Sequence, residues 1–426
     1  MLYYACIQKN SRRITMKKTL LLSVVASTMI MAGGDIAPVE PVVEAPVVAS
    51  GWDFSGEAVG YFQTVDNFGQ GSLFDQGPAT ATEGASAANI GLRLNAVNND
   101  LFAGIGFGAE VVGLGTLGLH KDIVSGVLQT GDGSLNSGAW TQGYLTYGFG
   151  NTSLKVGRQT LPKALSPFAF SETWNVFQNT FGAALVVNTD LPNTALVYVY
   201  VANANNHANL SDFNDLNGPG DGVHLVTLQN KSFDGLTLTG SWYYAPDMLV
   251  TEDVNILWGD AAFAVSDYSI GVQGGTILTG EPGAVVDTTA FGAKIGADFG
   301  MFDAYAAYTT VNDGTVGITN LATAGNPFAE TPLYTQMLAN VLAVASDNDT
   351  FVIGAGIDAL GGRFGAVYGN TTDNSPASAD YQEIDVTYTA NITENTSVLA
   401  AYIYSDVDVA GVDANNALRF WARYNF

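Results

Sequence analysis

The last nine residues of the chain, Leu418-Arg419-Phe420-Trp421-Ala422-Arg423-Tyr424-Asn425-Phe426, alternate between apolar and polar side chains. Successive side chains of an extended strand point to opposite faces, so the even-numbered residues form an apolar face. Arg419, Arg423 and Asn425 lie on the other face, with Trp421 between them. A soluble sheet would rarely end its chain on an exposed aromatic residue. A membrane barrel satisfies both faces, because the apolar face meets acyl chains and the arginines meet water inside.

The N-terminal segment has the form of a secretory signal. Met16-Lys17-Lys18 precedes an apolar run from Thr19 to Met31 and the small residues Ala32-Gly33-Gly34. This run is too short for a comfortable transmembrane helix. We expect Met16 to be the true start, so that residues 1–34 comprise an upstream artefact and a signal peptide. The single cysteine, Cys6, lies in the artefact, and the mature chain then needs no disulfide bridges.

Removal of the signal peptide makes the net charge of the chain more strongly negative. Five of the fifteen basic residues leave with residues 1–32 and no acid does, so ten basic residues face forty acidic ones, about −30 in all. Such a charge excludes nucleic acid as a partner and favours cations. Hydrophobic residues make up 47% of the chain, yet no apolar run after residue 31 approaches the length of a membrane-spanning helix.

Alternation of apolar and polar residues along strands explains how a chain can be rich in hydrophobic residues without a long apolar run. Residues 35–51 form a Pro/Val/Glu-rich linker, which we expect to be extended, and the period-two pattern follows from residue 52 to residue 426. A one-residue slip would place Arg93 or Lys294 in lipid at roughly 2–4 kcal/mol near the midplane, so the register is well specified. Eighteen strands are predicted, near 52–62, 86–97, 101–112, 138–149, 153–159, 180–188, 194–202, 222–229, 235–244, 254–265, 268–277, 288–299, 302–311, 350–360, 363–370, 381–391, 395–405 and 415–426.

The connections between these strands alternate in length. Links after even-numbered strands are tight turns such as Asn98-Asn99-Asp100 and Gly150-Asn151-Thr152, whereas links after odd-numbered strands are usually long, polar and acidic. A β-helix would require a fixed-period repeat, and soluble β-sandwiches would not require this rhythm. The sequence therefore predicts an all-β fold, a transmembrane antiparallel up-and-down β-barrel of about 18 strands with short periplasmic turns and long extracellular loops.

Eighteen strands enclose an aqueous channel, so inward charges would line a pore. Two interpretations stay open for them: paired charges that stabilise a solvated wall, or a transverse field that orders water and guides ions. The alternation places these charged residues inward: Arg93, Lys155, Arg158, Lys294, Arg363, Arg419, Arg423, Glu57, Glu110, Asp298, Asp303, Asp358, Glu383 and Asp385.

The third long loop, around residues 160–179, differs from the other loops because it is aromatic and apolar rather than acidic. Exposed to water, a loop of this character would form an adhesive patch. Folded into the barrel it would constrict the pore, and Lys163 and Glu172 would then set the constriction.

Residues around this loop resemble a known family. Gly157-Arg158-Gln159, a loop of about twenty residues and Asn179-Thr180-Phe181-Gly182-Ala183 resemble the OprD-like porins, and most of all the campylobacter-type major outer membrane porin. The resemblance implies an eighteen-stranded barrel in the outer membrane of a Gram-negative bacterium, in contact with lipid and lipopolysaccharide, that passes small hydrophilic solutes and often forms homotrimers. Tyr424 and Phe426 resemble the terminal signal read by the barrel assembly machinery.

The sequence contains few features that indicate a catalytic or metal-binding site. His120, His207 and His224 have no neighbouring hydrolase motif or zinc-ligand spacing, so we expect no enzyme. Carboxylates in the acidic loops offer oxygen ligands for Ca²⁺, although solvated anionic loops are the alternative. The candidate calcium ligands are Asp212, Asp215, Asp347 and Asp349. No other cofactor is expected.

Two functions remain in view. The first is an outer-membrane porin for passive diffusion of ions and small hydrophilic solutes, mildly cation-selective because its external mouth is acidic. The alternative is a surface barrel whose long acidic loops act in adhesion or partner binding.

Overall fold

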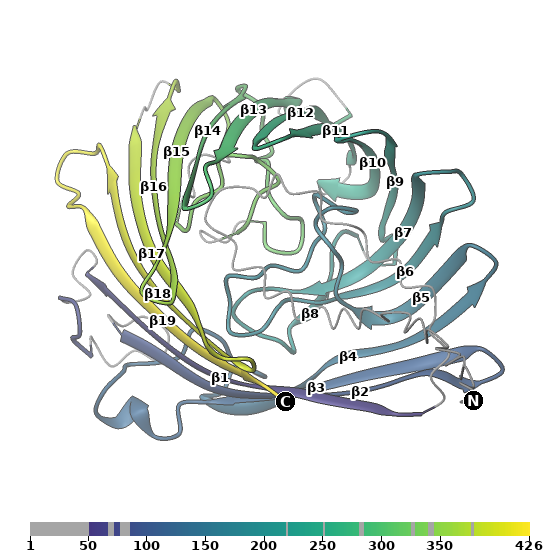
Figure 1. The fold of residues 1–426 in the computed structure, drawn as a ribbon, viewed down its shortest axis with the longest axis horizontal. Helices are drawn as coiled ribbons and strands as arrows, with labels where there is room; N and C mark the ends of the chain where they lie inside the picture. The colour runs from purple at the N-terminus through teal and green to yellow at the C-terminus, as the bar shows by residue number, and fades with distance from the viewer. Residues whose placement is uncertain are drawn as a thin grey trace, which may run out of the picture. The chain divides into compact units, whose positions relative to one another are not determined.

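Eighteen long antiparallel strands pair in chain order and close on themselves, because β1 pairs with both β2 and β19 (Figure 1). The computed structural model describes residues 51–66, 72–76, 86–218, 220–249, 252–280, 285–324, 329–339, 345–375 and 379–426. The predicted signal peptide and all of the predicted linker except Gly51 lie outside the described residues.

Each of the eighteen predicted strands is present, and the predicted barrel fold is confirmed. The sequence did not predict β8, a three-residue strand that pairs with β7, or the short 3-10 helix η1. The elements are β1 (Asp53–Asp66), β2 (Ser86–Phe102), β3 (Ile105–Gly115), η1 (Leu119–Lys121), β4 (Asn136–Phe149), β5 (Thr152–Gln159), β6 (Phe181–Asn188), β7 (Thr194–Asn205), β8 (Phe213–Asp215), β9 (Val223–Phe233), β10 (Leu236–Leu249), β11 (Glu252–Val265), β12 (Tyr268–Leu278), β13 (Thr288–Asp298), β14 (Phe302–Val311), β15 (Asn348–Ala359), β16 (Gly362–Asp373), β17 (Tyr381–Thr393), β18 (Thr396–Val407) and β19 (Asn415–Asn425).

Side chains alternate between the two faces of the wall as the sequence predicts. In β19, Phe420 is exposed on the outer face, whereas Arg419 and Trp421 are buried inside. Arg93 of β2 likewise lies between the exposed Leu92 and Leu94. The outer wall is therefore an apolar surface of the kind that a bilayer requires. No helix among the described residues has the length and apolar character needed to cross a membrane.

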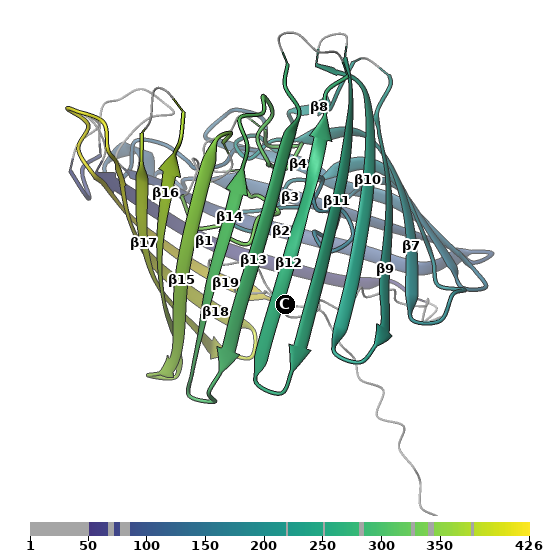
Figure 2. The ribbon, with the colours of Figure 1, turned by 90° about the horizontal axis from the view of Figure 1, so that it is seen from above.

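The short turns gather at one end of the barrel and the long loops at the other (Figure 2). Two predicted connections are wrong in detail. The turn expected at Asn98-Asn99-Asp100 is part of β2, and the chain reverses instead at Ala103 and Gly104, which both have positive φ. The link between β10 and β11, predicted at 245–253, spans two residues at the long-loop end, because both strands run further than their alternation indicated.

The third loop (residues 160–180) and the seventh loop (residues 312–347) lie inside the ring of strands, as Figure 1 shows for the described parts. Their apolar side chains pack against the inner wall of β6, β7 and β9–β14. Smaller apolar clusters join the seventh loop to β15, β16, β18 and β19, and the third loop to β1, β3 and β19. The core of this protein is thus inside the barrel, between the wall and the loops.

Candidate functional site

The inner wall of β6, β7 and β9–β14 is largely apolar and is covered by the third and seventh loops. Phe168 of the third loop is fully buried, with its ring centroid 5.6 Å from that of Tyr243 and 5.2 Å from that of Trp258. Its backbone N–H donates to the Tyr243 hydroxyl over 2.9 Å. The third loop therefore covers this wall with side chains that exclude water.

The sequence contains a signal for this covered wall. In β7 the inward residues Val197, Val199 and Val201 alternate with the outward Leu196 and Tyr198, so both faces are apolar. A strand with two apolar faces is buried on both sides. Lipid can cover only the outer face, so a protein segment has to cover the inner one.

The seventh loop packs across the third. The Nζ of Lys163 donates to the carbonyl of Thr331 over 2.6 Å and lies 4.8 Å from the Phe170 ring centroid. Ile318 and Leu333 of the seventh loop are fully buried in the same apolar cluster as Phe168. Lys163 therefore joins the two loops.

Two glutamates link the same loops by reciprocal hydrogen bonds. Oε1 of Glu172, in the third loop, accepts from Asn320 Nδ2 at 2.9 Å, from Thr323 Oγ1 at 2.5 Å and from the backbone N–H of Glu330 at 3.1 Å, all in the seventh loop. Oε1 of Glu330 in turn accepts from the backbone N–H groups of Thr173 at 2.7 Å and Trp174 at 3.2 Å. Each carboxylate thus binds the loop opposite its own.

His207 of the fourth loop (residues 206–222) completes this junction. Its Nε2 faces Glu172 Oε2, and its backbone carbonyl accepts from Asn175 at 2.8 Å and from Gln129 of the second loop (residues 116–135) at 3.0 Å. Burial, with the Glu330 carboxylate nearby, raises the pKa of Glu172 to about 8. Burial, with Arg419 nearby, lowers the pKa of His207 to about 4. Glu172 is only 2% exposed, so it lies within the junction of these loops.

A charged cluster occupies the inner wall where the first and last strands meet. Glu57 of β1 lies 2.7 Å from Arg423 Nη1 and 3.4 Å from Arg93 Nη2. Arg93 also lies 3.8 Å from Glu110 Oε2, and Arg423 donates to the carbonyl of Asn175 in the third loop over 2.9 Å. These charges are paired across the seam of the barrel, as the stabilising interpretation expects.

A second group of charges anchors the seventh loop. On β17, Glu383 accepts from the backbone N–H of Ala339 at 2.8 Å, and Asp385 accepts from that of Leu338 at 3.1 Å. Both carboxylates are almost fully buried, and Arg419 of β19, two strands away, is 5% exposed. The predicted inward acids of β17 therefore bind the backbone of a loop.

The charged residues near the short turns form a third group. Arg363 pairs with Asp303 and, over 2.8 Å, with Asp358. Asp298 is exposed and accepts from the backbone N–H of Gly300, 2.7 Å away, so it caps the turn between β13 and β14. Of the predicted wall charges, these are the ones most open to solvent.

Lys155 and Lys294 stand on two different parts of the wall, each over a tyrosine. The Nζ of Lys155 is 3.8 Å from the Tyr144 ring centroid, and that of Lys294 is 4.4 Å from the Tyr305 ring centroid. A cation over an aromatic face gains electrostatic stabilisation.

The expectation that Arg158 shares a wall with Lys155 is wrong. The two residues are three apart, which places them on opposite faces of a strand, and Arg158 pairs with Gly143 and Gly182 of the outward register. The guanidinium of Arg158 donates to Thr180 Oγ1 at 2.8 Å and to the carbonyl of Leu210 at 2.6 Å. It thus fastens the fourth loop at the rim.

The terminal residues lie on the outer face. Tyr424 and Phe426 are about half exposed, with ring centroids 6.0 Å apart. The backbone N–H groups of Phe426 and Gly56 each donate to the other residue's carbonyl, over 3.0 and 2.8 Å. The Phe426 ring also fills the space that a side chain at position 56 would need.

The candidate calcium ligands each have a hydrogen-bond partner within the protein. Asp212 accepts from Asn214 at 2.7 Å, Asp215 from Asn203, and Asp349 from the Tyr308 hydroxyl at 2.8 Å. Asp347 donates its backbone N–H to the carbonyl of Asn312. Within the described ranges, no three His, Cys, Asp or Glu side chains gather as metal ligands.

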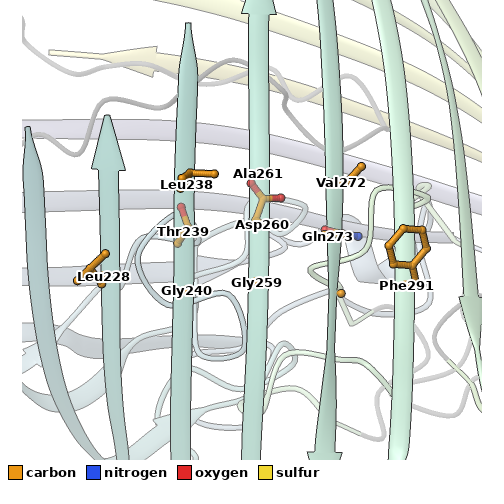
Figure 3. A pocket seen from close by; sticks show the side chains of 11 residues that line it. Leu228, Leu238, Thr239, Gly240, Gly259, Asp260, Ala261, Val272, Gln273 and Phe291 are labelled. Carbon is orange, nitrogen blue, oxygen red and sulfur yellow. The ribbon is translucent and has the colours of Figure 1, made fainter. Parts of the chain in front are cut away.

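An apolar depression of about 440 Å³ lies on the outer wall of β9–β13. Figure 3 shows Gly240 and Gly259 at the same level, with Leu228 on one side and Phe291 on the other. No atom lies within 4 Å of the position that a Cβ at Gly240 would take. The depression exists because paired glycines leave the strand surface uncovered.

Sequence reasoning missed Glu330, Asn320, Thr323 and the role of His207. The available signal was the composition of the seventh loop, which is unlike the acidic loops: Leu333, Tyr334 and residues 337–338 are apolar or aromatic. A long loop with such residues has a surface to bury, and its polar groups then need partners within the protein.

Solved structures with this architecture provide the comparison. Acinetobacter baumannii OccAB3 matches with a TM-score of 0.70 and 14% identity, over 88% of this chain and 99% of that one. The Pseudomonas aeruginosa outer membrane protein opdK matches at 0.68 and 15%, over 88% and 98%. A BenF-like porin from Pseudomonas fluorescens Pf-5 matches at 0.66 and 12%, also over 88% and 98%.

These matches confirm the predicted resemblance to OprD-like porins at the level of the fold. No protein-family model and no curated protein matches the chain.

Proposed function

We propose that this protein is an outer-membrane channel for passive diffusion of ions and small hydrophilic solutes. The observation that carries the proposal is the combination of a closed eighteen-strand wall, apolar outside, with loops folded against its inner face. Barrels of this strand number enclose more space than their own side chains fill. The third and seventh loops narrow that space, so they set the size of what passes.

The fold likeness to OccAB3, opdK and a BenF-like porin supports the same function and the outer membrane as its place. One matched structure is described as OpdK with vanillate, a small aromatic carboxylate. In this chain the arginines of the seam are already paired with Glu57 and Glu110, so we transfer no preference for carboxylates. No enzymatic activity is proposed.

Single-channel recording in planar bilayers tests the proposal. Purified, heat-modifiable protein should give discrete current steps that vary linearly with voltage. The control is the same preparation boiled before addition, which should give none. Intact barrels that insert without conducting would contradict the proposal and would favour the adhesion alternative.

That alternative has less support from the structure. The third and seventh loops, which carry the most apolar and aromatic residues, contact the inner wall and one another. The apolar third loop therefore forms no exposed adhesive patch, and adhesion through the acidic loops stays the alternative that the recording tests.

A further inference from the structure

We propose that three glycines of the inner wall, Gly91, Gly271 and Gly369, are positioning residues that receive side chains of the third and seventh loops and so fix the opening of the channel. We call them the socket glycines. The inference rests on the proposed channel function. It goes further, because it names the wall residues that determine where the loops lie.

The clearest contact is between Gly271 of β12 and Tyr334 of the seventh loop. The three atoms nearest to the position that a Cβ at Gly271 would take all belong to Tyr334, at 2.7, 2.9 and 3.0 Å. Ordinary contacts of a Cβ begin at 3.4 Å, so a methyl group there would displace the tyrosine hydroxyl by about 0.7 Å. The phenol thus fills the space that the missing side chain leaves.

Gly91 of β2 and Gly369 of β16 have contacts of the same kind. The ring of Phe177, in the third loop, lies 2.7 Å from the Cβ position of Gly91, and Val59 of the wall lies 2.8 Å from it. At Gly369 the nearest atom is the sulfur of Met337, in the seventh loop. Phe177 and Met337 are almost fully buried, so each is enclosed on all sides at its socket.

These contacts differ from the packing of the wall on itself. Gly108 and Gly354 are each covered by a tyrosine directly opposite on the neighbouring strand, Tyr144 and Tyr305 respectively. The socket glycines are covered instead by side chains from loops. A glycine within a strand often marks the close approach of another segment. The wall is therefore shaped to receive the two loops.

Hydrogen bonds hold the seventh loop at the β12 socket. The Tyr334 hydroxyl donates to Asp260 of β11. In the amide orientation that satisfies both groups, Gln273 of β12 accepts from the Tyr334 backbone N–H at 2.8 Å. Asp260 stands two residues from the buried Trp258 on the inner face of β11, so its bond to Tyr334 explains an acid in this largely apolar wall.

Two of the sockets lie on opposite sides of the ring. Counted along the order of the long strands, β12 is the ninth strand from β2 in a ring of eighteen, and β16 is the fourth beyond β12 (Figure 1). Lys163 and Glu330 join the third and seventh loops to one another. The joined loops therefore span the lumen from wall to wall, and their position across it depends on the sockets at both ends.

Gly271→Ala, made in the natural chain and in Tyr334→Leu, tests the β12 socket. In the natural chain the methyl group should displace Tyr334, so the seventh loop should lose amide protection at Leu338 and Ala339 in lipid nanodiscs. The current steps of single channels should also become less uniform in size. In Tyr334→Leu the same methyl group should change neither measurement further, because the phenol atoms that it would meet are absent.

Two further comparisons serve as controls. Gly240→Ala adds a methyl group to open space on the outer face of β10 and should change neither measurement. Gly369→Ala, made with and without Met337→Ala, repeats the test at a second socket. It also decides the matter if Gly271→Ala fails to assemble, which heat-modifiable mobility would reveal.

The outcomes separate this inference from the channel function. An unchanged seventh loop in Gly271→Ala, or an equal loss of protection with and without Tyr334, would overturn the sockets even if the protein conducts. Loss of protection that depends on Tyr334, in a protein without conductance, would support the sockets as loop-positioning residues and overturn the channel. In a conducting protein, uniform current steps despite that loss would show that the sockets do not fix the opening.

Discussion

At the scale of single residues, polar side chains of this barrel bind the backbone of chain segments that lack regular structure. Glu330 binds the third loop, Asp385 binds the seventh, and Arg158 binds the fourth. Sequence alternation placed Asp385 on the correct face and Arg158 on the wrong one, and it did not predict Glu330. Their contacts show that they hold loops in place.

Phe426 offers a test at this scale. Replacement by Ser should reduce the amount of heat-modifiable protein in the outer membrane several-fold, with export unaffected. The ring lies over Gly56 of β1, and the two backbones exchange hydrogen bonds, so the terminal residue seals the first strand to the last. Immunoblots of outer-membrane and periplasmic fractions measure the effect.

Phe426→Tyr is the matched control, because it keeps the ring and should assemble normally. Equal assembly of the Ser variant would mean that the terminal aromatic ring has no part in forming the seam.

At the scale of elements, the strands follow from alternation and the bends follow from glycine. Gly157 in β5 has a φ of 127°, a conformation that L side chains rarely adopt, and a Cβ there would collide with the carbonyl oxygen of Gly143. Gly240 in β10 has an ordinary backbone and open space around it. The backbone of β5 therefore requires glycine at position 157, whereas β10 does not require it at position 240.

Gly157→Ala should destabilise the barrel by about 1–3 kcal/mol, because neither the backbone angle nor the contact tolerates a Cβ. Gly240→Ala should change the stability by no more than about 0.5 kcal/mol. Urea titration followed by tryptophan fluorescence in detergent measures both. Equal midpoints for the two variants would show that β5 can relax around the added methyl group.

At the scale of the whole molecule, net charge predicts selectivity. Forty acidic residues against fifteen basic ones across the whole chain leave a strongly negative field, and the arginines of the seam are matched by Glu57 and Glu110. We therefore expect a modest preference for cations. It should be strongest at low ionic strength, since salt screens such a field over about 10 Å at 0.1 M.

The reversal potential across a salt gradient measures this preference. Repeating the gradient at high salt is the control, because screening should reduce the preference. A preference for anions at low salt would show that the inner arginines dominate over the acidic residues.

The strands and their register could be predicted because they depend on local alternation. Leu92, Arg93 and Leu94 must lie on known faces whatever the rest of the chain does, since a slip would expose a charge to lipid. The site could be predicted only in part. Lys163 and Glu172 were found through the unusual composition of their loop. Glu330 and His207 contact Glu172 from 158 and 35 residues away along the sequence, and no local sequence pattern predicts contacts at such a separation.

The sequence by itself therefore determined the barrel, its eighteen strands and its apolar outer wall, because hydrogen bonding within a membrane leaves a closed sheet as the one way to use alternating strands. Only the tertiary structure decided that the third and seventh loops turn inward to cover an apolar inner wall, and that Glu172, Glu330 and His207 meet there. Loop conformations depend on contacts between distant segments, and these form only after the wall that supports them has closed.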